Sequence, residues 1–208
     1  FDQLHRLGSE IAPLPTVPFP SRDLVALTMI AHDLLFLTDP SLDRLLARGA
    51  RTVVLPQARN GFPAGTRFFP DSNHGDYTVA PVLDGVPAGP AREALGWRDR
   101  AWASLESPAE HWLEFALPAP LRAGRLEIEW AWDNGLHHPA REFRVEIQPA
   151  GAVGQWSTVA RFSGNASPVN LVALPAMEFT GLRVVQAAGG GGPARPDLMW
   201  VQQIRLLP

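Results

Sequence analysis

The sequence predicts an α+β chain of two parts, in which a small, partial parallel α/β segment precedes an antiparallel β-sandwich. The first observation behind this prediction is the distribution of tryptophan, since all seven residues of this type lie between Trp97 and Trp200. The second is a change of hydrophobic periodicity from helical spacing to strict alternation along the chain. We therefore expect a helix and partial α/β segment over residues 1–56, a connector over 57–75 and a sandwich over 76–208.

The first part combines a short helix, a proline-rich connector and a strand–helix–strand pattern. Asp2 is a suitable N-cap for a helix with an apolar face, and the prolines of residues 13–20 favour extended backbone after it. Residues 34–37 predict a strand, residues 39–46 a helix, and residues 52–55 the next strand. Two strands separated by a helix indicate a small parallel layer.

Alternation of apolar and polar residues predicts the strands of the second part. In residues 126–131, Leu, Ile and Trp alternate with Glu and Ala, and residues 142–147 repeat the pattern. Such alternation is typical of antiparallel strands with one buried face. The strands expected on this basis cover residues 102–104, 112–117, 126–130, 143–147, 156–162, 182–186 and 200–207.

Composition excludes several classes of function. The formal net charge is −3, whereas nucleic acids and anionic membranes select strongly basic surfaces, so we expect neither partner. The chain has no Cys, which excludes disulfides and thiolate metal sites, and all 18 basic residues are Arg, which excludes Schiff-base chemistry. The apolar stretch of residues 24–37 is too short to span a bilayer. Because the chain starts at Phe1 without a leader pattern, we expect a processed product or a piece of a longer protein.

Several motifs of the second part resemble, in their order, those of discoidin or F5/8 type C domains. The matching segments are residues 83–85, 102–104, 111–117, 126–130, 143–147, 181–185 and 204–206, together with Trp156. The resemblance implies a galactose-binding-like jelly roll, a fold that many carbohydrate-binding modules also use. The first part resembles, as a generic strand–helix–strand, the final barrel helix and an accessory domain in the C-terminal regions of multidomain glycoside hydrolases.

The resemblance also raises the question of a structural calcium ion. In members of the family that bind one, an early Asp-Gly turn and an acidic residue before the last apolar pair help to form the site. Asp84 is present here, but Gln203 stands where the acid is common. An amide carbonyl is a weaker ligand for this cation than a carboxylate. Calcium at Asp84 and Gln203 stays open as an alternative, and we expect no other cofactor.

Residues 131–141 carry the side chains that best suit a sugar-binding site. They place an aromatic ring, an amide, two imidazoles and a guanidinium between two predicted strands. A sugar ring offers an apolar C–H face to an aromatic side chain and hydroxyl groups to polar ones. In sugar-binding members of the resembled family, the corresponding segment contributes Arg, Asn and His contacts. The expected ligand-binding residues are Trp132, Asn134, His137, His138 and Arg141.

A purely structural interpretation of this segment is the alternative. The Asp-Asn-Gly run at residues 133–135 tolerates positive φ and is typical of a hairpin turn, in which case Trp132 would cap the core. Adjacent residues of a strand point to opposite faces, so His137 and His138 do not suit one shared metal ion.

Three further residues are candidate ligands outside that segment. Trp97 and Arg98 precede a predicted strand and are expected at the same end of the sandwich. The alternative for Arg98 is a surface Arg–Asp pair of small energetic value. Arg195 follows the glycine run of residues 189–192, which predicts a flexible loop because no helix follows to bind a phosphate.

We expect no catalytic residue in this chain. A glycosidase needs two carboxylates in a cleft, whereas the strand glutamates fall on the polar phase of the alternation and are expected to face solvent. These glutamates are Glu127, Glu129, Glu142 and Glu146. Residues 71–76 contain Asp, Ser and His, but no strand–turn–helix elbow presents the serine as a nucleophile.

The sequence favours a non-catalytic carbohydrate-binding β-sandwich from the C-terminal region of a multidomain glycoside hydrolase. The expected partners are a carbohydrate and the catalytic domain of the parent chain, and a secreted or periplasmic bacterial location is favoured over a cytoplasmic one. One alternative is a structural or interaction domain that packs on the parent enzyme without binding sugar. Another is a segment that completes the parent's active site.

Overall fold

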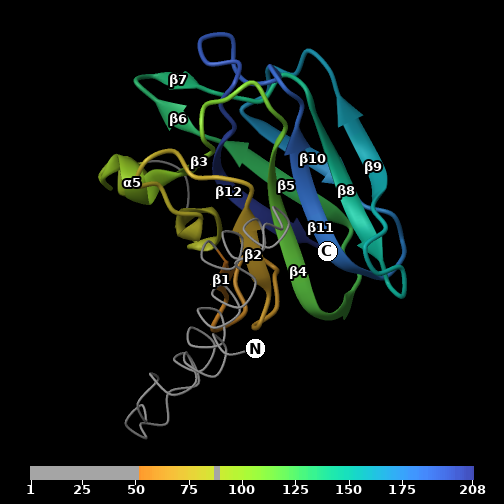
Figure 1. The fold of residues 1–208 in the computed structure, drawn as a ribbon. Coiled ribbons are helices and arrows are strands. Elements are labelled where there is room, and N and C mark those ends of the chain that lie inside the picture. The colour runs from red at the N-terminus through yellow and green to blue at the C-terminus, as the bar shows by residue number, and fades with distance from the viewer. Residues whose placement is uncertain (1–51, 87–89) are drawn as a thin grey trace, which may run out of the picture. The chain divides into compact units, whose positions relative to one another are not determined.

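The structure, a computed structural model, describes residues 52–86 and 90–208 (Figure 1). Two antiparallel sheets face each other as layers, a six-stranded sheet of order β1-β2-β4-β11-β8-β9 and a four-stranded sheet of order β10-β5-β12-β3. The strands are β1 (Val53–Val54), β2 (Arg67–Pro70), β3 (Trp102–Ala103), β4 (His111–Leu121), β5 (Arg125–Trp130), β6 (Trp132–Asp133), β7 (Leu136–His137), β8 (Phe143–Pro149), β9 (Ser157–Phe162), β10 (Val169–Ala173), β11 (Phe179–Gln186) and β12 (Trp200–Leu207). The helical turns are η1 (Ala80–Leu83), α4 (Pro90–Glu93) and α5 (Trp97–Arg100).

The core lies between the two sheets, where the alternating apolar residues meet. Ile128 and Trp130 of β5 face Val145 of β8 across the sandwich interior, and all three side chains are fully buried. Each such side chain contributes roughly 1.5–3 kcal/mol by leaving water. The indole N–H of Trp130 donates to Oδ1 of Asn170 at 2.6 Å, so its one polar atom is satisfied inside the core. The predicted β-sandwich is confirmed.

The sandwich begins earlier in the chain than the sequence indicates. Residues 52–55, expected as a parallel strand, contain β1, which pairs antiparallel with β2. The expected connector over residues 57–75 contains β2 itself, which pairs with β4. Phe68 of β2 is buried against Phe115 of β4, with ring centroids 6.1 Å apart. The sequence did not predict β2 because its four residues are too few to show the alternation of apolar and polar side chains.

The remaining elements of the expected α/β segment, within residues 1–51, lie outside the described residues. In the second part, the strand β10 is an addition to the predicted set, and it forms an edge of the four-stranded sheet beside β5. Among the residues that the structure describes, no helix is long and apolar enough to cross a bilayer.

Two of the strand glutamates do not face solvent, contrary to expectation. Glu129 and Glu146 keep only 4% and 6% of their surface exposed. Glu146 lies between Arg144, whose Nε is 2.8 Å from Oε1, and Arg183. Burial raises the pKa of Glu146, but the two guanidiniums outweigh burial and hold it below its usual value. The expectation is wrong because alternation shows on which face of the sheet a side chain lies, but not which other parts of the chain cover that face.

Short helical segments cover the outer face of the four-stranded sheet. The turn η1 contacts β12, and α4 and α5 follow it along the same side of the molecule as the β6–β7 hairpin (Figure 1). Gln203 of β12 donates to Oδ1 of Asp84 and to the carbonyl of Val86, just after η1, and is fully buried. The short helical segments also leave a pocket beside the hairpin.

Candidate functional site

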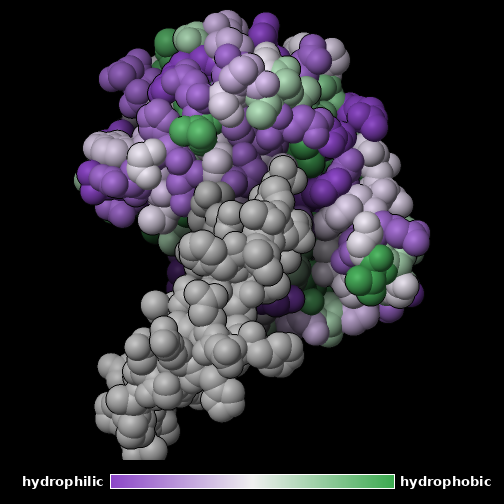
Figure 2. All heavy atoms as spheres, in the orientation of Figure 1, coloured by the Kyte–Doolittle hydropathy of each residue, from purple (hydrophilic) through white to green (hydrophobic). Residues whose placement is uncertain are grey.

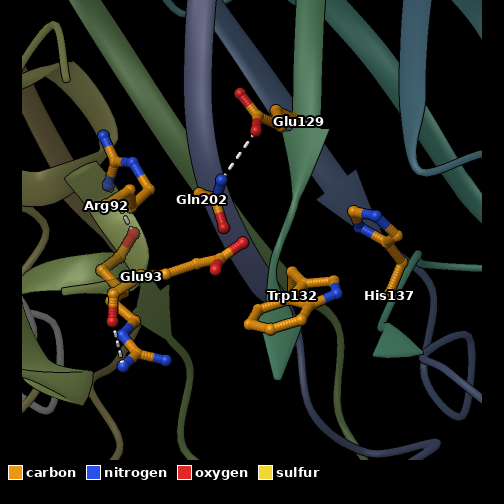
Figure 3. Close-up of a pocket in the computed structure, with 7 residues that line it drawn as sticks. Arg92, Glu93, Glu129, Trp132, His137 and Gln202 are labelled. Carbon is orange, nitrogen blue, oxygen red and sulfur yellow. Dashed lines mark hydrogen bonds between the residues drawn. The ribbon is translucent and has the colours of Figure 1, made fainter. Parts of the chain in front are cut away.

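The pocket, of about 180 Å³, opens on the outer face of the four-stranded sheet (Figure 3). Its floor comes from β5 and β12, one wall from α4 and α5, and the other wall from the β6–β7 hairpin. The lining residues are Arg92, Glu93, Arg100, Glu129, Trp132, His137 and Gln202. Segments far apart in the sequence thus converge on one small concave site.

The floor of the pocket consists of a buried carboxylate and a buried amide. Glu129 points outward because its neighbours Ile128 and Trp130 point into the core. Gln202 of β12 donates from Nε2 to Oε1 of Glu129 at 2.6 Å, which fixes the orientation of both groups. The amide oxygen of Gln202 is turned toward the open side of the pocket (Figure 3).

The hairpin wall carries two of the residues that the sequence analysis selected. Trp132 and His137 are cross-strand partners in the β6–β7 pair, so their side chains share one side of the hairpin. The turn between them has positive φ at Asn134 (50°) and Gly135 (80°), the backbone that tight hairpins require. The turn interpretation therefore holds for Asn134, whereas Trp132 lines the pocket instead of capping the core.

The opposite wall was missed by the sequence analysis. Glu93 extends toward Gln202 and Trp132 from the end of α4 (Figure 3). Arg100 of α5 donates to the backbone carbonyls of Leu95 (2.8 Å) and Glu93 (2.5 Å), and so holds this wall together. Both helices have only four residues, too few for a helical period to appear in the sequence.

The charges of the lining cancel. Arg92 and Arg100 contribute two positive charges, and Glu93 and Glu129 contribute two negative ones, so the formal sum over the lining residues is zero, and Arg92 is also paired with Asp84 behind the lining. The pocket therefore offers an aromatic ring and several hydrogen-bonding groups without an excess of either sign. Such a lining suits an uncharged polar ligand better than an ionic one.

Two other predicted residues belong to a separate aromatic cluster, formed by Tyr77, Trp97, His138 and Trp200. The ring of Trp97 packs on Tyr77 with centroids 4.6 Å apart and stays 49% exposed. The ring of His138 lies 5.0 Å from that of Trp200. Arg98 lies 2.7 Å from a carboxylate oxygen of Asp76, which is the surface pair named above as its alternative.

The guanidiniums of Arg141 and Arg195 do not line the pocket, since the first binds the glycine-rich loop and the second pairs with Glu106. Arg141 donates from Nε to the carbonyl of Gly191 at 2.9 Å and from Nη2 to that of Gly189 at 3.4 Å. Arg195 pairs with both carboxylate oxygens of Glu106, at 3.1 and 2.6 Å. The structure thus brings Trp132 and His137 together, but places the other predicted ligands elsewhere.

The residues expected to hold calcium do not fit the ion. Oδ1 of Asp84 accepts a hydrogen bond from Nη2 of Arg92 at 2.5 Å, so a cationic side chain already occupies its coordination space. Gln203 turns its amide N–H toward Asp84 and the carbonyl of Val86, and its oxygen accepts from Arg205. In the described parts of the chain, no three His, Cys, Asp or Glu side chains cluster at metal-binding distance.

No family model and no curated protein matches this sequence. Among solved structures, chitosan-binding module 1 from a chitosanase/glucanase of Paenibacillus sp. IK-5 is similar with a TM-score of 0.55 at 14% identity, covering 73% of this chain and 100% of that module. The family 32 carbohydrate-binding module of Clostridium perfringens NanJ, in complex with galactose, is similar at 0.51 and 11% identity, covering 74% and 98% of the two chains.

A larger enzyme contains the same fold. A GH29 fucosidase of Ruminococcus gnavus, in complex with fucose, is similar with a TM-score of 0.54 at 13% identity, and the match covers 80% of this chain but 28% of the fucosidase. Identities this low establish the fold and nothing finer. The described part of the chain is a jelly-roll β-sandwich with the same fold as these carbohydrate-binding modules.

Proposed function

We propose that this chain is a non-catalytic carbohydrate-binding module and that the pocket between the hairpin and α4–α5 holds one sugar unit. The observation that carries the proposal is the placement of Trp132 and His137 opposite Glu93, above the amide of Gln202. An aromatic ring suits the C–H face of a sugar, and the carboxylates, amide and imidazole suit its hydroxyls.

The size and charge of the pocket support the same ligand class. Drug-sized ligands occupy pockets of about 300 Å³ or more, and this one, at about 180 Å³, is suited to a smaller molecule or to one unit of a polymer. Its zero formal charge suits a neutral sugar. The glutamate of the floor has its Oε1 hydrogen-bonded to Gln202, which fits a role in binding.

The similar structures support a place for this module in a larger enzyme. Two of them are binding modules, one of which comes from a chitosanase/glucanase, and the third is a fucosidase of which the match covers 28%. We propose that this chain belongs to the C-terminal region of a secreted or periplasmic bacterial glycoside hydrolase. Weak sugar binding would then keep the parent catalytic domain close to its polymer.

The complete chain, screened on a glycan array and then titrated with the glycans it retains, tests the proposal. Trp132→Ala should weaken binding by about tenfold, because a ring contact of this kind is worth on the order of 1.4 kcal/mol. The matched control is Leu136→Ala, which removes another apolar side chain from the same hairpin, one that is exposed and does not line the pocket.

The possible outcomes test separately whether the chain binds sugar and whether the pocket is the place where it binds. An array on which the folded chain retains no glycan overturns sugar binding. Binding that survives Trp132→Ala but is lost in Trp97→Ala moves the site to the aromatic cluster. Equal losses in Trp132→Ala and Leu136→Ala point to a disturbed hairpin and contradict a direct contact of Trp132 with the sugar.

One observation favours the alternative of an interaction domain. An apolar groove of about 320 Å³ runs beside β1, where Val54 is 53% exposed. Most of its lining is apolar, with Arg59, Thr78, Asp84 and Asp99 as the polar members, and the apolar lining residues are Val53, Val54, Leu55, Pro56, Phe68, Ala80, Pro81, Leu83 and Leu95. By contrast, the described part of the face in Figure 2 is largely hydrophilic, with apolar residues in small separate groups. A blank array would make this groove the first place to look for a protein partner.

A further inference from the structure

A buried guanidinium occupies the place where the sequence resemblance suggested calcium. Arg92 is 2% exposed, and three oxygen atoms from two chain segments, residues 84–86 and the end of α5, converge on it. Its Nη2 donates to Oδ1 of Asp84 at 2.5 Å and to the carbonyl of Val86 at 2.7 Å. Its Nη1 donates to the carbonyl of Arg100 at 2.5 Å. The oxygens around Arg92 are thus one carboxylate and two backbone carbonyls.

This oxygen set satisfies a guanidinium and not a calcium ion. Calcium takes about six to eight oxygen ligands and favours several carboxylates. Here Asp84 is the one carboxylate, and Gln203 offers N–H groups to the cluster in place of its carbonyl oxygen. A guanidinium has five N–H donors in a planar fork, which three convergent oxygens can use at once.

We infer that Arg92 is a built-in cation that takes the structural place of a bound metal, so that this chain folds and keeps its pocket without calcium. The guanidinium ties residues 84–86 and the end of α5 to α4. Because Glu93 follows Arg92 directly and Arg100 ends α5, the same contacts set the position of the helical wall of the pocket. Arg92 is therefore a positioning residue, and its role does not depend on whether the pocket binds a sugar.

The first test uses the unaltered chain. The melting temperature is measured in excess calcium chloride and in excess EDTA. A ligand that binds only the folded state raises the melting temperature with its concentration, so the expected result is the same melting temperature in both solutions. A calcium-dependent rise of several degrees that EDTA reverses would overturn the inference.

The second test replaces the planar guanidinium of Arg92. Arg92→Lys keeps the positive charge but cannot bind three oxygens in one plane, and it should lower the melting temperature by roughly 5–10 °C. Amide hydrogen exchange of residues 92–100 should become faster, while that of β4, β8 and β11 should stay slow at temperatures well below the transition. A lysine variant that matches the original chain in both measurements contradicts the assignment.

Chemical rescue tests whether Arg92 acts as a cation with hydrogen bonds or only fills space in the fold. Arg92→Ala leaves a hole lined by the carboxylate of Asp84 and the two carbonyls. Millimolar methylguanidinium should raise the melting temperature of this variant but not that of the original chain, and methylammonium, with equal charge, should raise it less. Equal rescue by both cations would overturn the role of the fork. If the alanine variant does not fold, the calcium and lysine tests still decide.

Discussion

The imidazole of His111, which is 1% exposed, joins three segments at one end of the sandwich. Its Nδ1 lies 2.8 Å from a carboxylate oxygen of Asp71, and its Nε2 lies 3.1 Å from the carbonyl oxygens of both Ser107 and Asp197. All of these partners accept hydrogen bonds, so both ring nitrogens are placed to donate. Burial alone would lower the pKa of His111, but the hydrogen bond and charge of Asp71 outweigh it, and the pKa is raised.

The same contacts show that Ser72, Asp71 and His111 do not form a catalytic triad. Ser72 donates from Oγ to Oδ2 of Asp71 at 2.7 Å, and that oxygen also contacts His111. The carboxylate therefore stands between the hydroxyl and the imidazole, whereas a triad needs the imidazole in the middle. Asp71 also accepts from the backbone N–H of Trp112, which marks it as a structural anchor.

The raised pKa of His111 predicts that the stability of the fold depends on pH. Because its pKa is higher in the folded state than in the unfolded one, its contribution is complete below the unfolded pKa of about 6.5 and is lost as pH rises through the folded pKa. Relative to His111→Gln, the original chain should be more stable by about 2 kcal/mol at acidic pH, and the difference should shrink at alkaline pH. Urea unfolding of both proteins across this range measures it. A difference that grows with pH would contradict the charged imidazole.

At the scale of elements, the turn before β2 is fastened to the strand β12. The backbone N–H of Leu206 donates to the carbonyl of Asn60 at 2.8 Å, and the amide of Asn60 donates to the carbonyl of Ile204 at 3.0 Å. Gly61 sits at this contact with φ of 78°. A Cβ atom on Gly61 would lie 2.0 Å from the carbonyl oxygen of Leu206, a distance that no packing allows. The turn and the strand therefore approach each other through a glycine.

Gly61→Ala should be much more costly than the same change at a free turn. Gly154 is the matched control, because its φ of 76° is nearly the same but a Cβ atom added there would meet nothing within 4 Å. The control should lose only the backbone term of about 1–2 kcal/mol, whereas Gly61→Ala should lose roughly 3 kcal/mol or more. Chemical denaturation gives both values. Equal losses would mean that the turn does not pack on β12.

At the scale of the whole molecule, the strands before residue 76 complete the core. Phe62 and Phe68 are both buried and stack with Phe115, with centroid distances of 4.8 and 6.1 Å to its ring. Loss of each phenylalanine from a core costs about 3–5 kcal/mol, and the total stability of a domain is only about 5–15 kcal/mol. The sandwich should therefore not survive removal of these strands.

Two truncations test this boundary. A chain that starts at Thr52 should keep the cooperative thermal transition of the sandwich, because it retains β1, β2 and both phenylalanines. A chain that starts at Tyr77, close to the boundary expected from the sequence, should lose that transition and expose the face of β4. Circular dichroism during heating distinguishes the two results. An unchanged transition in the chain that starts at Tyr77 would support the boundary at residue 76 that the sequence predicted.

The sequence alone determined the features that depend on local backbone geometry. Successive side chains of a strand point to opposite faces, so the alternation in residues 126–130 and 143–147 identified two central strands and their buried sides. Asn134 and Gly135 likewise indicated a turn, because few other residues tolerate positive φ. Trp132 and His137 were selected for the side-chain types of their segment, and the structure shows that the hairpin makes them cross-strand partners.

Only the tertiary structure decided what covers each face and which distant groups meet. Nothing near Glu129 in the sequence indicates that it is buried beside Gln202, and nothing near Glu93 places it opposite Trp132. The partner of Asp84 is an arginine on a helical turn of four residues, too short to leave a periodic signal. Such contacts close long loops at an entropic cost that packing of the complete chain offsets, so no local window of sequence reports them.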